Sequence, residues 1–304
     1  MTAHRTTAHS AGPRTTPLDA PLDTPLAASL STADLVDGWR RVGVREGMAM
    51  IVHSSLSSLG RVDGGAAAVV ASLREAVGPG GTVAVPTFTT AVVRDPAPEH
   101  AGLPSPEVAE RRAAVPLFHP GLPSPMGAVP EALRALSESL RSTHPQASVA
   151  AVGAHAREVT ARRSLGFAVG RESPFGALHD LGGYVLLIGV GHNRNTFLHY
   201  AETFAPNRRL KLRRFPMAIQ GERVWIEAPD VGDDNDTHFP VVGKEFEERA
   251  GIREVLVGNA PCRLIPVREL IPFAGGRPPP PRGAGGPPPP PAGGGGREKT
   301  TAPH

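Results

Sequence analysis

A strand–helix–strand pattern near the N-terminus constrains the fold of this 304-residue chain more than any other feature. A short apolar run at 48–54 has the length of a strand, and the Ala-rich segment 64–78 has the composition of a helix. A Gly-Pro-Gly sequence at 78–80 ends that helix, and the β-branched run 81–87 is typical of a second strand. Strands joined through a helix pair in parallel with a right-handed crossover. The pattern therefore predicts an α/β domain.

Later segments extend this pattern into a sheet. Strands are expected at 148–153, 182–191 and 252–258, and the second is apolar throughout, as in strands buried on both faces. Two alternating runs within 208–228 meet at Gln220 and Gly221 and predict an added antiparallel hairpin. The expected fold class is thus α/β, with a central mixed, largely parallel sheet flanked by helices. Those helices are expected at 31–43, 130–140, 154–163, 195–204, 240–250 and 267–273.

The composition changes at both ends of the chain. Residues 1–30 are rich in Thr, Ala and Pro without periodicity, which predicts a disordered N-terminal arm. Residues 275–304 contain 10 Pro and 9 Gly and predict a disordered Pro/Gly-rich tail. The segment 31–274 between them is expected to form one domain. Within it, 90–125 holds eight prolines, and so long a loop is usually functional or disordered.

Charge and cysteine content limit the class of protein. The net charge of +3 resides in the tail, which carries four basic residues and one acidic residue. It therefore does not indicate nucleic-acid binding, which needs a basic stripe on the domain. A single cysteine, Cys262, excludes an intrachain disulfide and a multi-cysteine metal site and fits a reducing compartment. Since no long apolar run or apolar signal segment is present, we expect a cytoplasmic protein that binds neither membrane nor nucleic acid.

Two polar segments are candidates for ligand binding. The segment HSSLSSLG (53–60) follows the first expected strand, and ligands of open α/β sheets gather beyond such strand ends. Its hydroxyl and backbone N–H groups could hold a carbonyl or a phosphate, although a serine-rich turn can also simply cap a helix. The segment RSTHPQAS (141–148) is rich in donors and kept extended by Pro145. It suits an oxyanion or an amide, or it is a surface loop.

A histidine and a glutamate form the candidate catalytic pair. His199 and Glu202 lie three residues apart in an expected helix, so they share one face. A neighbouring carboxylate raises the proton affinity of a histidine and fixes its tautomer. His199 is therefore a candidate general base at neutral pH, with a buried structural histidine as the alternative.

Acidic residues are concentrated in one segment after the expected hairpin. This segment, 227–239, is either a wall that attracts a cationic ligand or a solvated loop. Its candidate substrate-binding residues are Asp230, Asp233, Asp234 and Asp236.

Several familiar motifs are missing from the chain. It has no phosphate-binding P-loop, no nucleophile elbow and no HExxH zinc motif. The sequence RSLGFA (163–168) matches the pyrophosphate loop of the common small-acyltransferase (GNAT) fold only by chance, because that loop requires a strand before it and a helix after it. Here a helical segment precedes the match and a loop follows it.

Taken together, the chain resembles the aminoglycoside N3-acetyltransferase family, also called the antibiotic N-acetyltransferase family. The resemblance extends from about residue 31 to 273, and its specificity comes from the order and spacing of seven blocks. These blocks are VHSSLSSLG (52–60), GPGGTVAVPTFT (78–89), PMGAVPEALR (125–134), RSTHPQASVAAVG (141–153), SPFGAL (173–178), LLIGVGHNRNTFLHYAE (186–202) and VGNAPCRLIPVRELIPFA (257–274).

The resemblance implies a catalytic domain at 31–274 with a fold distinct from the GNAT fold. It implies acetyl-CoA as the donor and the 3-amino group of a 2-deoxystreptamine antibiotic as the acceptor. No metal is expected, because no set of His and carboxylate residues has the spacing of metal ligands. His199 matches the family's base and Glu202 its acidic partner, while the acidic segment maps to the drug side. The protein would be a monomer or homodimer. The residues expected to face CoA are Ser54, Ser55, Ser57, Ser58, Thr87, Arg141, Ser142, His144 and Ser148.

Two other functions stay open at this point. The chain could be a CoA-dependent N-acetyltransferase of another amine, such as a biosynthetic intermediate. It could also bind aminoglycosides or CoA without turnover, although an intact His199 and Glu202 argue against this.

Overall fold

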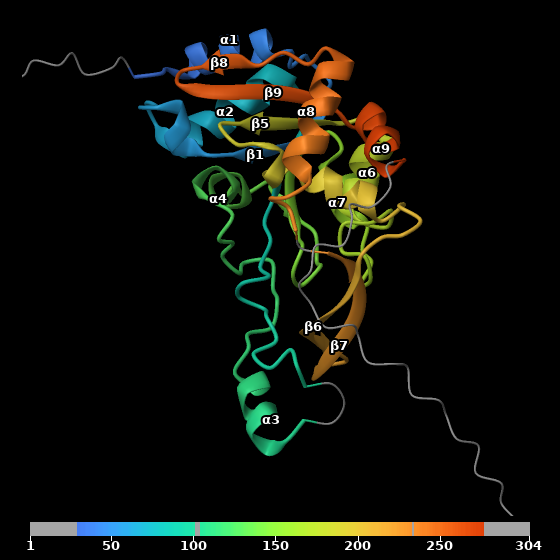
Figure 1. The fold of residues 1–304 in the computed structure, drawn as a ribbon. Coiled ribbons are helices and arrows are strands. Elements are labelled where there is room, and N and C mark those ends of the chain that lie inside the picture. The colour runs from blue at the N-terminus through green and yellow to red at the C-terminus, as the bar shows by residue number, and fades with distance from the viewer. Residues whose placement is uncertain (1–28, 101–103, 233, 277–304) are drawn as a thin grey trace, which may run out of the picture.

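A seven-stranded mixed sheet forms the centre of the computed structural model, which describes residues 29–100, 104–232 and 234–276 (Figure 1). The strand order is β3-β4-β2-β1-β5-β9-β8, so β1 and β2, the two strands of the β-α-β unit, lie in the middle of the sheet. The strands are β1 (Ala49–Ser54), β2 (Thr82–Pro86), β3 (Leu140–Arg141), β4 (Val149–Gly153), β5 (Tyr184–Ile188), β8 (Val255–Val257) and β9 (Ala260–Pro266).

Parallel pairing is confined to the middle of this sheet. β1 pairs in parallel with β2, in the register Ala49 to Thr82, and with β5, in the register Met50 to Tyr184. This confirms the β-α-β unit and the mixed α/β sheet. The remaining pairings are antiparallel, so the parallel share is smaller than expected. β8 and β9 are joined by a two-residue turn, which links antiparallel neighbours, and β4 and β9 run antiparallel to the central strands β2 and β5.

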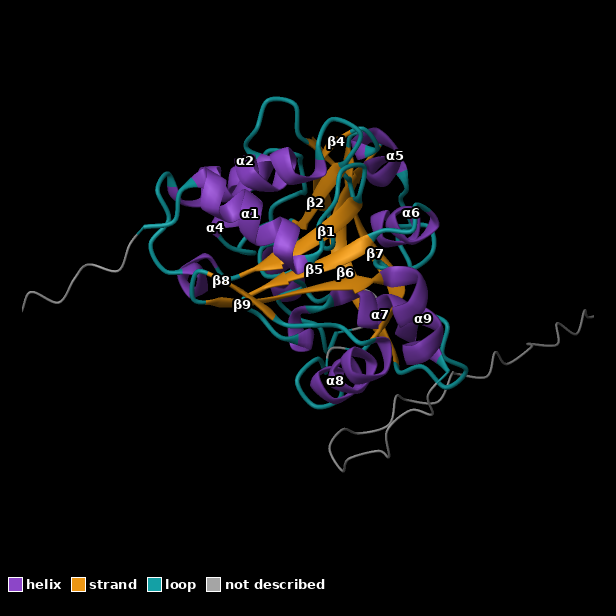
Figure 2. Cartoon of the chain, turned by 90° about the horizontal axis from the view of Figure 1, so that it is seen from above, coloured by secondary structure: helices purple, strands orange, loops and turns teal. Residues whose placement is uncertain are grey.

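Helices cover both faces of the sheet, as expected (Figure 2). Side chains alternate along β1, so Met50 and Val52 enter the core beneath one layer, while Ile51 enters the core beneath the other. The first layer consists of α1 (Thr32–Val42), α2 (Gly65–Val77) and α4 (Ala128–Arg134). The second consists of α5 (Ala156–Ala161), α6 (Pro174–Asp180), α7 (Thr196–Glu202), α8 (Phe239–Ala250) and α9 (Val267–Gly275).

The Pro-rich segment and the hairpin form a second, smaller packing unit. The hairpin of β6 (Leu210–Ile219) and β7 (Glu222–Val231) turns at Gln220 and Gly221, whose φ angles of 52° and 87° fit a two-residue turn. The Pro-rich segment contains an unexpected helix, α3 (Pro106–Ala113). Both elements project from the same side of the sheet (Figure 1). The Pro-rich segment and the hairpin share a small hydrophobic core, which consists of Val93, Val115, Leu122, Phe215 and Ala228.

A buried ion pair fixes the Pro-rich segment internally. Arg112 Nη2 lies 2.8 Å from Asp95 Oδ2, and both side chains are less than a tenth exposed. Burial opposes ionisation of Asp95, but hydrogen bonds from Arg112 and the Ala97 N–H outweigh it and hold the pKa below its usual range. The Arg112 guanidinium also lies over the Trp225 ring of the hairpin. This long segment is therefore an ordered part of the fold that packs against the hairpin.

The predicted terminal arm and tail lie almost entirely outside the described residues. Leu30, which we assigned to the arm, forms a bridge with Val62, and α9 reaches Gly275. None of the helices in the described ranges is long and apolar enough to cross a membrane.

Candidate active site

The carboxyl ends of the three parallel strands meet at one edge of the sheet. Ser54 ends β1, Pro86 ends β2 and Ile188 ends β5, and Ser54 is paired with Ile188. Three segments lie beyond this edge: the serine loop (residues 53–60), the segment that begins at Thr87, and the glycine turn (residues 189–191) that leads into α7. This is the edge at which ligands bind in open α/β sheets.

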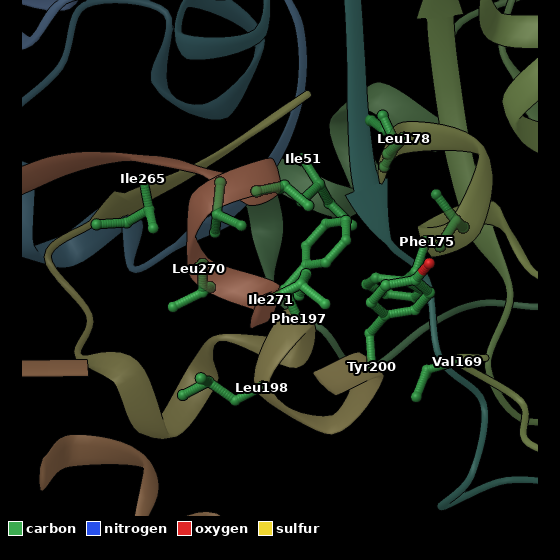
Figure 3. Close-up of a cluster of buried hydrophobic side chains, with 14 of the residues drawn as sticks. Ile51, Val169, Phe175, Leu178, Phe197, Leu198, Tyr200, Ile265, Leu270 and Ile271 are labelled. Carbon is green, nitrogen blue, oxygen red and sulfur yellow. The ribbon is translucent and has the colours of Figure 1, made fainter. Parts of the chain in front are cut away.

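Helix α7 carries the predicted catalytic pair at this edge. Asn195 caps the helix, because its Oδ1 accepts the Phe197 N–H at 3.1 Å. Phe197, Leu198 and Tyr200 point into the core (Figure 3). The opposite face presents His199 and Glu202, with His199 Nδ1 lying 2.6 Å from Glu202 Oε2. Their side chains are 14% and 20% exposed, so the pair is largely shielded yet reachable.

The other nitrogen of His199 meets a residue that the sequence analysis missed. His199 Nε2 lies 2.6 Å from Asn235 Oδ1, and Asn235 Nδ2 donates to the Asn193 carbonyl at 3.4 Å. The Asn193 carbonyl therefore directs the amide oxygen toward the ring. Because Glu202 and Asn235 both present acceptors, the ring makes both bonds only when each nitrogen carries a hydrogen. Asn235 lies within the segment that we selected for its aspartates.

His199 lines a cavity of about 220 Å³ between the sheet edge and the hairpin. Its polar lining combines the proposed base with one carboxylate and one guanidinium, so both signs of charge face the space. Segments far apart in the sequence contribute to its wall. The lining residues are Phe88, Thr90, Gln146, Ala147, Ala168, Val169, Thr196, His199, Arg213, Asp230, Val231, Gly232 and Asn235.

The predicted aspartates separate into different roles. Asp230 is buried, lines the cavity and accepts from Arg213 Nε at 2.5 Å. The Thr237 N–H donates to Asp234 and lowers the pKa of that carboxyl. Asp236 accepts from the Asn193 amide at 2.9 Å. These two anchor the loop beside the cavity, and Asp233 lies outside the described residues.

The serine loop packs against the glycine turn. Ser58 Oγ donates to the Ser55 carbonyl at 2.6 Å, and Ser55 Oγ lies 3.2 Å from Ser57 Oγ. A Cβ on Gly189, whose φ is +61°, would lie 1.7 Å from Ser58 Oγ, so glycine is required there. Ser54 Oγ is buried and makes no hydrogen bond to the described part of the chain. Such an atom fits a site in which a ligand supplies the partner.

The remaining residues expected to face CoA form hydrogen bonds within the protein. Arg141 Nη2 donates to the Thr87 carbonyl at 2.8 Å, and Ser148 Oγ donates to the same carbonyl at 2.7 Å. Ser142 Oγ accepts from the Val149 N–H at 2.9 Å. These bonds fix loops of the cleft wall, and direct contact of these side chains with CoA stays a prediction.

His144 connects two walls of the cavity. Its Nδ1 accepts from the N–H groups of Gln146 and Ala147 at 3.1 and 3.0 Å, and its Nε2 lies 3.4 Å from the Leu165 carbonyl. Burial lowers the pKa of His144, which favours the neutral ring that this pattern of bonds requires. The geometry gives His144 a structural role. Contact with CoA, which we expected for it, stays a prediction.

Stability at acid pH is expected to depend on His53, which precedes the serine loop. Its ring is buried, and burial lowers its pKa from 6.5 to about 4. Below pH 6.5 the unfolded chain therefore binds a proton that the folded chain resists, so stability falls as the pH falls. Between pH 7 and 4.5 this histidine should cost about 2–3 kcal/mol of unfolding free energy. Urea titrations of the wild type and of His53→Leu at both pH values measure the difference. An identical pH dependence in the two proteins would contradict the assignment.

Comparisons with known proteins identify the family of this chain. The family model for aminoglycoside 3-N-acetyltransferase matches residues 51–276. The chain is 33% identical to the aminoglycoside N(3')-acetyltransferase-like protein YokD of Bacillus subtilis, over 79% of this chain and 89% of that protein. It is 32% identical to aminoglycoside N(3)-acetyltransferase III of Pseudomonas aeruginosa, over 80% of this chain and 91% of that enzyme.

Solved structures share the fold. The binary complex of AAC-IIIb with CoASH superposes with a TM-score of 0.72 at 30% identity, covering 82% of this chain and 96% of that one. AAC-VIa bound to sisomicin gives a TM-score of 0.72 at 30% identity, covering 81% and 96%. The expected departure from the GNAT fold is thereby confirmed. From the matched blocks, the shared fold and this identity over most of both chains, it follows that the chain belongs to the aminoglycoside 3-N-acetyltransferase family.

Proposed function

We propose that this protein transfers the acetyl group of acetyl-CoA to the 3-amino group of the 2-deoxystreptamine ring of aminoglycosides, and so confers resistance to them. The observation that carries this proposal is the position of His199. It lies on the wall of the cavity with Glu202 at one nitrogen and a replaceable amide at the other. Membership of the family supports the same donor and acceptor. We expect the protein to act in the cytoplasm, as a monomer or homodimer.

His199 would serve as the general base. An aliphatic amine is mostly protonated at neutral pH and cannot attack a carbonyl until it loses a proton. In the neutral ring, with its hydrogen on Nδ1 toward Glu202, Nε2 carries no hydrogen and does not bond Asn235 Oδ1. An ammonium group of the acceptor that takes the place of the Asn235 amide could then donate its proton to Nε2. Glu202, at 2.6 Å from Nδ1, would hold the tautomer and stabilise the charged ring.

The serine loop would receive the acetyl donor. Acetyl-CoA supplies an activated acetyl group, and attack on it places negative charge on its carbonyl oxygen. Ser54 Oγ, buried without a partner among the described residues, and the hydroxyls of Ser55 and Ser57 are suited to donate toward that oxygen or toward the pantetheine chain. Each well-placed donor to such an oxygen is worth about 3 kcal/mol of barrier.

Direct transfer fits the position of the only cysteine. Cys262 is fully buried in β9, and burial raises the pKa of its thiol to about 11. A neutral buried thiol is a poor nucleophile. The amine would therefore attack the thioester in a ternary complex, and proximity would supply much of the rate.

Product analysis tests this function directly. Gentamicin, kanamycin and neomycin are each incubated with acetyl-CoA and the protein. We expect release of CoA thiol, a mass gain of one acetyl group, and NMR shifts that place the amide at the 3-amino position. Thiol release with other amines but with none of the three drugs would instead indicate a different acceptor. Binding of the drugs or CoA without thiol release would indicate a binding protein.

A further inference from the structure

A second histidine–carboxylate pair lies behind the catalytic helix. His192 begins η2 (His192–Arg194), the short turn between β5 and α7, and only 6% of it is exposed. Its Nε2 lies 2.9 Å from Glu247 Oε1 on α8, and its Nδ1 lies 3.2 Å from Asn195 Nδ2. The proposed mechanism uses none of these three residues.

The hydrogen bonds of this group run in one direction. Asn195 Oδ1 accepts the Phe197 N–H, so its Nδ2 is the donor toward His192. His192 Nδ1 must then be the acceptor, and its hydrogen resides on Nε2, which donates to Glu247. Glu247 also forms an ion pair with Arg263, whose Nε lies 3.0 Å from the same oxygen. Asn195 is fully buried. The Asn195 amide and the His192 ring therefore each donate to an acceptor, and these bonds fix the capping amide of α7.

The same turn also places the residue that faces His199 Nε2. The Asn193 side chain donates to Asp236 at 2.9 Å, and its carbonyl accepts from Asn235. Asn195 begins the helix that carries His199 one turn later. The turn that His192 begins therefore controls both the ring and the amide in front of it.

Close packing keeps the His192 ring in its place. A Cβ at Gly243 of α8 would lie 1.9 Å from His192 Cγ, so the ring lies directly on the backbone of α8. The ring can exchange neither of its partners without moving away from that surface.

We propose that His192 is a positioning residue for the acetyl transfer. Through its bonds to Asn195 and Glu247 it fixes the start of α7 and the turn that binds Asn235. It thereby holds the His199 ring in the position that proton transfer requires. This role rests on the proposed function of His199. It assigns a kinetic consequence to a contact between η2 and α8 that lies outside the cavity.

Two substitutions at His192 separate positioning from simple packing. His192→Leu removes both hydrogen bonds, and we expect kcat to fall by about 10–100-fold with little change in either KM, because a small misplacement of a catalytic group is costly. His192→Asn keeps an acceptor for Asn195 and should recover most of the loss. His155→Leu is the matched control, because His155 forms a similar pair with Glu158, at 3.2 Å, at the start of α5, where both side chains are exposed to 40% or more.

An NMR measurement makes the test independent of which amine the enzyme acetylates. The 2.6 Å bond between His199 and Glu202 should give a far-downfield proton signal in NMR spectra of histidine-labelled protein. We expect His192→Leu to shift or broaden this signal, and His192→Asn and His155→Leu to preserve it. If no aminoglycoside is acetylated but the signal responds in this way, the positioning role stands and the proposed function fails.

Other results would overturn the proposal. An unchanged signal and unchanged kcat in His192→Leu would remove His192 from the positioning of His199. An equal loss in His192→Leu and His192→Asn, together with a lowered melting temperature, would show a purely structural role. Should His192→Leu not fold, Glu247→Leu and Glu247→Gln provide the same comparison, because the glutamine keeps an acceptor oxygen for His192. Equal kcat and equal signals in these two variants would contradict the proposal.

Discussion

Replacing His199 with alanine is expected to lower turnover by about 10²–10⁴-fold, the usual contribution of general acid–base catalysis. His199 is the histidine whose ring both lines the cavity and contacts a carboxylate within the described ranges. Without it, the proton of the acceptor amine loses the imidazole that the proposed mechanism gives it as acceptor. Initial rates of CoA thiol release at saturating substrates measure the effect. The affinity for CoA, measured by calorimetry, should change little, since the serine loop is a separate segment.

A histidine–glutamate pair elsewhere in the chain serves as the control. His155 and Glu158 have the same three-residue spacing and a 3.2 Å contact at the start of α5, but their side chains are 41% and 50% exposed. His155→Ala should retain full turnover. Near wild-type activity in His199→Ala would show that another group, or solvent, removes the proton, and would end the proposed mechanism.

The sequence predicted those parts of the fold that depend on local patterns. The helix expected at 31–43 is present as α1, with a capping box of Ser31 and Asp34 at its start. The hairpin turns at Gln220 and Gly221, as the two alternating runs predicted. The catalytic pair could be predicted for the same reason. Three-residue spacing on a helix fixes the neighbours His199 and Glu202 without any tertiary information.

Elements that depend on tertiary contacts were missed. The seven-residue helix α6 contains Gly176, where a Cβ would lie 1.9 Å from the Arg171 carbonyl, so packing decides both the residue and the helix. β9 begins and ends near prolines, which hid it, and it exists because β5 and β8 pair with it on either side. Asn235 reaches His199 across 36 residues of sequence, a contact that no local pattern indicates.

The donor-rich segment 141–148 also shows that tertiary contacts cannot be predicted from local sequence. Its residue types identified hydrogen-bond donors correctly, but a sequence does not say which acceptors they meet. In the structure Arg141 donates to carbonyls of the Pro-rich segment, so a motif that resembles an anion site also connects two parts of the fold.

Replacing Arg141 with leucine is therefore expected to destabilise the protein, by at least about 3 kcal/mol of unfolding free energy, because a hydrogen bond from a charged donor contributes about 1.5–3 kcal/mol and several are lost together. The guanidinium donates to the carbonyls of Thr87, Pro120 and Leu122 and lies 5.0 Å from the centre of the Phe118 ring. Burial lowers its pKa to about 10, so the group is still charged at neutral pH. Urea unfolding measures the loss.

The outcome also decides between the two roles that Arg141 has been given. A structural clamp predicts lower stability and faster proteolysis within 90–125, because the carbonyls that held this segment to the sheet lose their donor. A residue that binds CoA predicts a raised KM for acetyl-CoA at unchanged stability. Arg74→Leu is the control, since Arg74 meets only the exposed Glu138 among the ion pairs of the described chain and should cost less than about 1 kcal/mol. If Arg141→Leu is no less stable than that control, the hydrogen bonds from Arg141 do not hold the Pro-rich segment in place. CoA binding would then be the better explanation of Arg141.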